Sequence, residues 1–136
     1  MNATSENRVV CVWAGSFASE DDYRCYMAMH YDDDDAKPRF GIDTGLEWYD
    51  EDFLESWWIE GFSTEKLEIY VRGVLHSDVF YDELKDVIAR HEANAFIFMF
   101  GEHGEDPINK ELFDYDGRCG RDAKVVHIFK KAYAAP

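Results

Sequence analysis

Short apolar runs separated by polar segments predict that strands and helices alternate along this chain. Residues 8–14 (RVVCVWA) and 95–100 (AFIFMF) are almost continuously apolar. Runs of this length, bounded by polar or turn residues, are typical of central strands that are buried on both faces. Residues 124–129 (KVVHIF) predict a third strand, and residues 40–42 predict a short additional one.

Apolar residues at helical spacing predict four helices. Ser19, followed by three acidic residues, is a suitable cap for the first helix, because acidic side chains favour the positive end of a helix dipole. Residues 50–60 (DEDFLESWWIE) predict the second helix, since Phe53/Trp57 and Leu54/Trp58 are spaced four apart. Ser63 is a candidate cap for a third helix, but residues 67–74 also suit a strand, and both possibilities stay open. Apolar spacing over residues 80–91 predicts the clearest helix, which begins at Ser77 or Asp78.

The predicted order of elements is β, α, β, α, α, α, β, β. It indicates an α/β (α+β) fold in which about four helices pack on a mixed central sheet. A chain of 136 residues is long enough to bury one core. We therefore expect a single globular domain over residues 1–136, with residues 1–7 frayed.

Charge narrows the classes of function. The chain has 29 Asp and Glu against 14 Lys and Arg, a net charge of −15, yet 46% of it is hydrophobic and 16% aromatic. A folded, strongly negative surface repels nucleic acid and anionic membranes and attracts basic proteins. No apolar run reaches the ~20 residues of a membrane helix, no signal peptide is visible, and three cysteines without metal spacing suit a reducing compartment. These features predict a cytoplasmic protein that binds neither nucleic acid nor membranes directly.

Three motifs in the first half of the chain are more specific. Residues 12–17 (VWAGSF) end a strand in W-x-G-x-F before an acidic helix start, and residues 40–43 (FGID) precede residues 48–55 (WYDEDFLE). This combination resembles the bacterial immunity protein 22 family of polymorphic toxin systems, over roughly residues 9–60. The resemblance implies that the chain binds and neutralises a toxin domain encoded beside it, without enzymatic chemistry. The charge of this chain predicts that the toxin is basic, and we expect it to be a nuclease.

Acidic and aromatic side chains are the candidate partner-binding residues. Aromatic side chains beside acids can hold Arg and Lys, although acids at a helix start also serve as caps. The candidates come from an acidic loop and from the acidic-aromatic segment: Asp32, Asp33, Asp34, Asp35, Trp48, Tyr49, Asp50, Glu51, Asp52 and Glu55. Four adjacent Asp residues lack the ligand spacing of a calcium loop, so no metal or cofactor is expected.

Two other functions stay open at this point. A small metal-dependent enzyme would use His103, in the acidic segment 102–106, together with His76 or His127. An acidic adaptor or DNA mimic would bind a different basic protein. Neither a nucleophile motif nor zinc spacing accompanies His103, so we expect no catalytic residues and a surface loop there. The chain is either a monomer or a homodimer.

Overall fold

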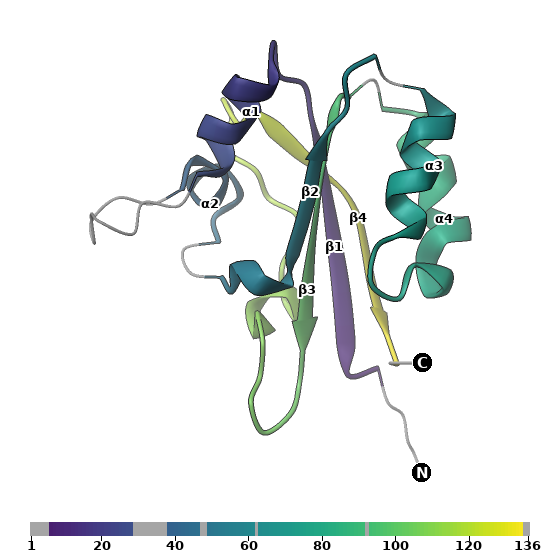
Figure 1. Cartoon of the computed structure of the whole chain (residues 1–136). Helices are drawn as coiled ribbons and strands as arrows, with labels where there is room; N and C mark the ends of the chain where they lie inside the picture. The colour runs from purple at the N-terminus through teal and green to yellow at the C-terminus, as the bar shows by residue number, and fades with distance from the viewer. Residues whose placement is uncertain (1–5, 29–37, 47–48, 62, 92, 135–136) are drawn as a thin grey trace.

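The computed structural model describes residues 6–28, 38–46, 49–61, 63–91 and 93–134, which form a sheet covered on both faces (Figure 1). The four strands have the order β2-β3-β1-β4, and every adjacent pair is antiparallel. The elements are β1 (Arg8–Gly15), α1 (Glu20–Met27), α2 (Arg39–Thr44), η1 (Glu51–Phe53), β2 (Leu54–Trp58), α3 (Thr64–Arg72), α4 (Ser77–Ala89), β3 (Ala95–Glu102), η2 (Lys110–Phe113) and β4 (Val125–Tyr133).

The two central strands are the two continuous apolar runs of the sequence, as predicted. β1 pairs with β3 over its whole length, from Arg8 opposite Glu102 to Gly15 opposite Ala95. All but one residue of each strand is buried, because helices cover both faces of the sheet. β4 pairs with the other side of β1, where the register shifts between Val12 and Trp13.

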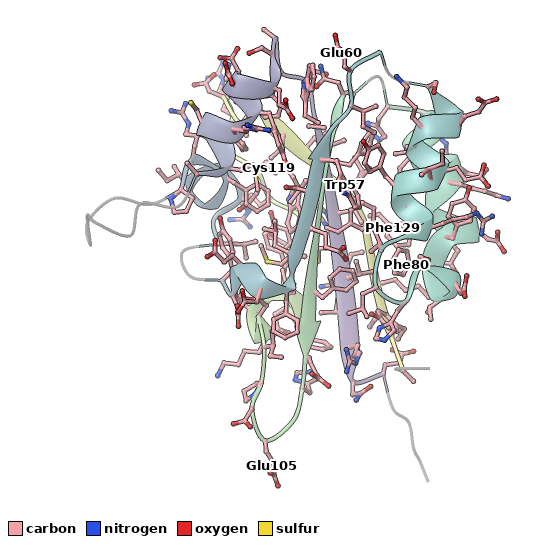
Figure 2. All side chains as sticks on the ribbon, in the orientation of Figure 1. Trp57, Glu60, Phe80, Glu105, Cys119 and Phe129 are labelled. Atoms are coloured by element: carbon pink, nitrogen blue, oxygen red, sulfur yellow. The ribbon has the colours of Figure 1, made fainter. Side chains whose placement is uncertain are left out.

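Alternation along the central strands divides the core into two layers. Figure 2 shows Phe80 and Phe129 in the layer on the side of α3 and α4. The other layer lies against α1, α2 and η2 and includes Trp13, Phe40 and Leu112. Large aromatic residues therefore pack on both faces of the sheet, among a larger number of aliphatic side chains.

Two predicted elements are wrong, and they are neighbours in the sequence. Residues 40–42, predicted as a strand, lie in helix α2, which ends at Gly45 in the left-handed region (φ 79°). Residues 50–60, predicted as a helix, form η1 and strand β2. The spacing misled because residues four apart share a face in a strand as well as in a helix. Trp57 and Trp58 therefore face opposite core layers, each partly buried.

The remaining helices agree with the sequence patterns. Ser19 caps α1 by accepting a hydrogen bond from the Asp22 amide, and Ser63 caps α3 through the Lys66 amide. The segment left open, residues 67–74, begins within α3 and is therefore helical as far as Arg72. The predicted α/β (α+β) class is confirmed, with four α-helices among the described residues. The sheet was predicted to be mixed, whereas all of its described strand pairs are antiparallel. None of the described helices is long and apolar enough to cross a membrane.

Candidate functional site

The acidic-aromatic segment predicted to bind a partner divides between core and surface. Trp48 lies outside the described residues. Tyr49 is half-buried and packs edge-on against Phe40 at a ring distance of 5.9 Å. Burial raises the pKa of the Tyr49 hydroxyl to about 12. Its ring thus contributes to the core layer beneath α2 rather than to an open surface.

The three acids that follow Tyr49 are exposed on the short helix η1. Asp50 caps η1, because its carboxylate accepts the Asp52 amide at 3.0 Å, as proposed for a helix start at this position. Glu51 and Asp52 project from its first turn into solvent. Glu55 differs, since it is half-buried in β2 and its carboxylate accepts the Leu75 amide at 3.3 Å. Asp50, Glu51 and Asp52 are therefore the accessible charges of the segment.

A buried asparagine joins these acids to a second acidic segment. Asn109 adopts a left-handed backbone conformation (φ 43°) just before η2. Its side-chain oxygen accepts the Asp50 amide at 2.7 Å, and its side-chain nitrogen donates to the Phe100 carbonyl at 3.0 Å. The two short helices are thus fixed side by side at one end of the sheet (Figure 1).

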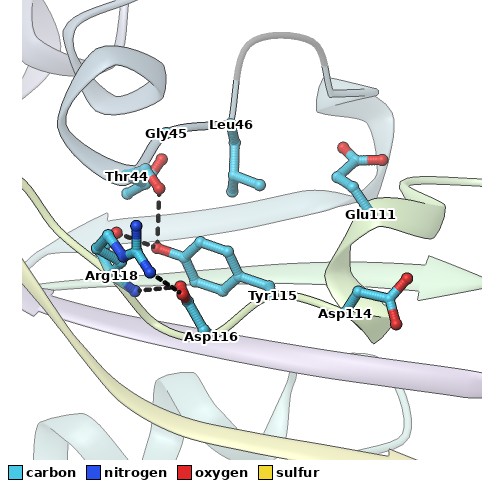
Figure 3. Close-up of a pocket in the computed structure, with 8 residues that line it drawn as sticks. All are labelled: Thr44, Gly45, Leu46, Glu111, Asp114, Tyr115, Asp116 and Arg118. Atoms are coloured by element: carbon cyan, nitrogen blue, oxygen red, sulfur yellow. Dashed lines mark hydrogen bonds and ion pairs between the residues drawn. The ribbon is translucent and has the colours of Figure 1, made fainter.

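An open pocket of about 680 Å³ lies beside η2 (Figure 3). Tyr115 lies across it, and its hydroxyl is within 3.0 Å of the Thr44 carbonyl. Asp116 pairs with Arg118 at 3.0 Å on one side of the ring. Among the described residues, no ion pair neutralises Glu111 or Asp114, which line the pocket on the other side.

Together these charges form an exposed surface that we call the acidic corner, comprising Asp50, Glu51, Asp52, Glu111 and Asp114. All five side chains are exposed, and Asn109 holds their two helices together. Lys110 lies next to Glu111 in η2, and Arg118 lines the same pocket, so the charge of this surface is not exclusively negative. The acids outnumber these basic groups, and exposed carboxylates attract Lys and Arg side chains. The corner can therefore bind a basic protein surface, and its charge raises the rate of encounter.

Sequence reasoning found three of the five residues of the acidic corner. Glu111 and Asp114 were not among the candidates, although residues 110–116 (KELFDYD) repeat the mixture of acids and aromatics seen in residues 48–55. That compositional similarity is the signal that could have found them. The acidic loop Asp32–Asp35 lies outside the described residues, so its proposed role stays a prediction.

The histidines of the proposed metal enzyme have different neighbourhoods. His103 is exposed and stacks on Phe113 at a ring distance of 3.6 Å. The Nδ1 atom of His76 lies 3.0 Å from the Tyr133 hydroxyl. His127 packs against Trp13, and burial lowers its pKa. No group of three or more His, Cys, Asp and Glu among the described residues is arranged to hold a metal ion.

Comparison with known proteins gives one match. A family model described as Immunity protein 22 matches residues 10–107, which is more than half of the chain. The match extends well past the first 60 residues, where the sequence motifs are found, and includes β3. No curated protein and no solved structure matches the chain.

Proposed function

The chain belongs to the immunity protein 22 family, and we propose that it neutralises a cognate toxin domain by binding it. Family membership carries this proposal. The acidic corner supports it, because five exposed carboxylates that make no ion pair with other described residues favour a basic partner. The protein then acts by association alone, in the cytoplasm, and needs neither metal nor cofactor.

The chemistry of the surface suggests how inhibition works. A nuclease binds its substrate through Lys and Arg side chains that contact phosphates. Carboxylates of the acidic corner would occupy the same side chains and exclude the nucleic acid. We therefore propose a basic nuclease as the target, with the net charge of −15 accelerating association. Aromatic and apolar contacts would supply most of the affinity.

Calorimetry tests the proposal directly. The partner to use is the toxin domain encoded beside the gene for this chain, carrying an inactivating substitution. We expect 1:1 binding, together with inhibition of nucleic-acid cleavage by the active domain. Absence of binding would refute neutralisation, whereas binding without any nuclease activity of the domain would refute only the identity of the target.

Charge variants test the binding surface. Replacing Glu111→Gln and Asp114→Asn removes two charges from the acidic corner. We expect the association rate at low salt to fall about 3- to 10-fold, since steering depends on local charge. The control variant Asp82→Asn with Asp86→Asn removes two exposed charges from α4, on the opposite face of the sheet. Equal slowing by both variants would show that net charge alone, rather than the acidic corner, steers the encounter.

A further inference from the structure

The two edges of the sheet are protected to different degrees. An edge strand exposes unpaired backbone groups, and proteins commonly guard it with lysines, prolines or bulges. β4 carries Lys130 and Lys131, and its pairing with β1 is shifted at a bulge. β2, with the sequence LESWW, has none of these features. In Figure 1, no described element lies over its outer side.

The phase of hydrogen bonding identifies which backbone groups of β2 point outward. The Ile59 amide donates to the Asn94 carbonyl of the segment entering β3, at 2.7 Å. In an antiparallel pair such bonds recur at every second residue, so the backbone amides and carbonyls of Glu55 and Trp57 also point toward β3. Ser56 and Trp58 therefore direct their amides and carbonyls away from the sheet.

Side chains beside this edge form an apolar surface. Trp57 packs on Tyr70 of α3 at a ring distance of 5.5 Å. Ile69 and Tyr70 are 74% and 39% exposed, which is unusual for large apolar residues that already lie side by side. A pocket of about 420 Å³ lies at the end of the edge, between these residues and Trp58. An extended chain added to β2 could place its own side chains against this surface.

Acidic side chains bracket the same edge. Glu51 and Asp52 of η1 immediately precede β2. At its other end, Glu20 and Glu60 line the pocket together with one basic residue, Lys66. Figure 2 shows Glu60 at that end of the strand. A segment that pairs with β2 therefore meets net negative charge at both of its ends, more strongly at the η1 end. A second copy of this chain, with a net charge of −15, would be repelled from this position.

We propose that an extended segment of the toxin domain, with basic residues flanking an apolar centre, adds to the sheet as a fifth strand beside β2. The inference rests on the proposed function, because it takes the toxin as the partner. β2 has five residues, so the paired segment spans about 17 Å at roughly 3.3 Å per residue. Main-chain hydrogen bonds then contribute to affinity, and the bracketing acids select a basic partner.

Residue-resolved hydrogen exchange of the free protein and of its complex with the inactivated toxin domain tests this pairing. We expect the amides of Ser56 and Trp58 to exchange at least about tenfold more slowly in the complex. The amides of Glu55 and Trp57, already bonded to β3, provide an internal control and are protected before the toxin is added.

A pair of isoleucine variants gives an independent test. Ile69→Ala removes an exposed side chain beside the β2 edge, and Ile42→Ala removes a similarly exposed one from α2. We expect Ile69→Ala to weaken binding about 5- to 10-fold and Ile42→Ala to leave it unchanged. Equal effects of the two substitutions would overturn the proposed position of the partner.

The outcomes separate this inference from the function on which it rests. Failure of the toxin domain to bind at all would refute the proposed function. Tight binding without added protection of Ser56 and Trp58 would overturn strand addition and leave neutralisation standing. Protection that rises with the concentration of this chain alone would identify a second copy as the occupant and would also overturn the proposal.

Discussion

Asn109 is the residue through which the acidic corner is attached to the sheet, and replacing it should destabilise the protein measurably. Its side chain bonds the Asp50 amide and the Phe100 carbonyl, and its backbone adopts φ 43°. Asn109→Ala removes these two hydrogen bonds and a longer third one, from the Asn109 side-chain nitrogen to the Asp50 carbonyl at 3.3 Å. It also places a Cβ-bearing residue without a polar side chain in the left-handed region. Asn109→Gly removes the same bonds but fits this backbone conformation.

The expected magnitude follows from these contacts. Each lost hydrogen bond costs about 0.5–1.5 kcal/mol, and the buried Phe100 carbonyl is left without its side-chain donor, so about 2–3 kcal/mol is expected for the bonds. Alanine in the left-handed region costs about 1–2 kcal/mol more. Glycine instead adds about 0.5–1 kcal/mol through the entropy of the unfolded chain. We therefore expect losses of about 3–5 kcal/mol for alanine and slightly less for glycine.

Urea unfolding followed by tryptophan fluorescence measures both variants. The free energies of unfolding in water, extrapolated with equal slopes, give the two losses. A loss below about 1 kcal/mol for Asn109→Ala would refute the view that Asn109 holds the acidic corner on the sheet. A larger loss for glycine than for alanine would refute the proposed backbone strain.

Two further predictions concern stability. In the folded state, burial lowers the pKa of His127 below its ordinary value of 6.5. As the pH falls, the unfolded chain therefore binds a proton at this histidine at a higher pH than the folded protein does. The free energy of unfolding consequently decreases as the pH falls below about 6.5. Between pH 7.5 and pH 5 the free energy of unfolding should therefore fall more for the natural protein than for His127→Gln, and equal falls would contradict this origin. Gly101→Ala would place a methyl group 2.8 Å from the Asn109 carbonyl in a central strand, and we expect it to lower the free energy of unfolding by about 2 kcal/mol or more. Thermal unfolding checks this second loss, and an unchanged midpoint would show that the strand can shift to make room.

Segments whose pattern of apolar residues fits only one kind of secondary structure could be predicted from the sequence. The sequences of β1 and β3 are almost continuously apolar, so they have no polar face and do not fit an amphipathic helix. Ser19 and Ser63 cap α1 and α3, the helices that were predicted to follow them. The helix predicted over residues 50–60 was wrong because apolar residues spaced four apart lie on one face of a strand as well as of a helix. Their structure is decided by pairing with β3, a contact between distant parts of the chain.

The candidate site was recoverable only in part for a similar reason. Asp50, Glu51 and Asp52 stand out because they are adjacent in the sequence. Glu111 and Asp114 join them only because Asn109 bonds across 59 residues, from a backbone conformation that no local pattern requires. Tyr49 and Glu55 looked like surface residues but face neighbouring elements, since the segment enters the sheet as a strand rather than lying on it as a helix.

Growth of cells that express the neighbouring toxin domain tests the central claim most directly. The account predicts that the active domain arrests growth and that co-expression of this chain restores it. Continued arrest in cells where the chain is folded and abundant would contradict neutralisation.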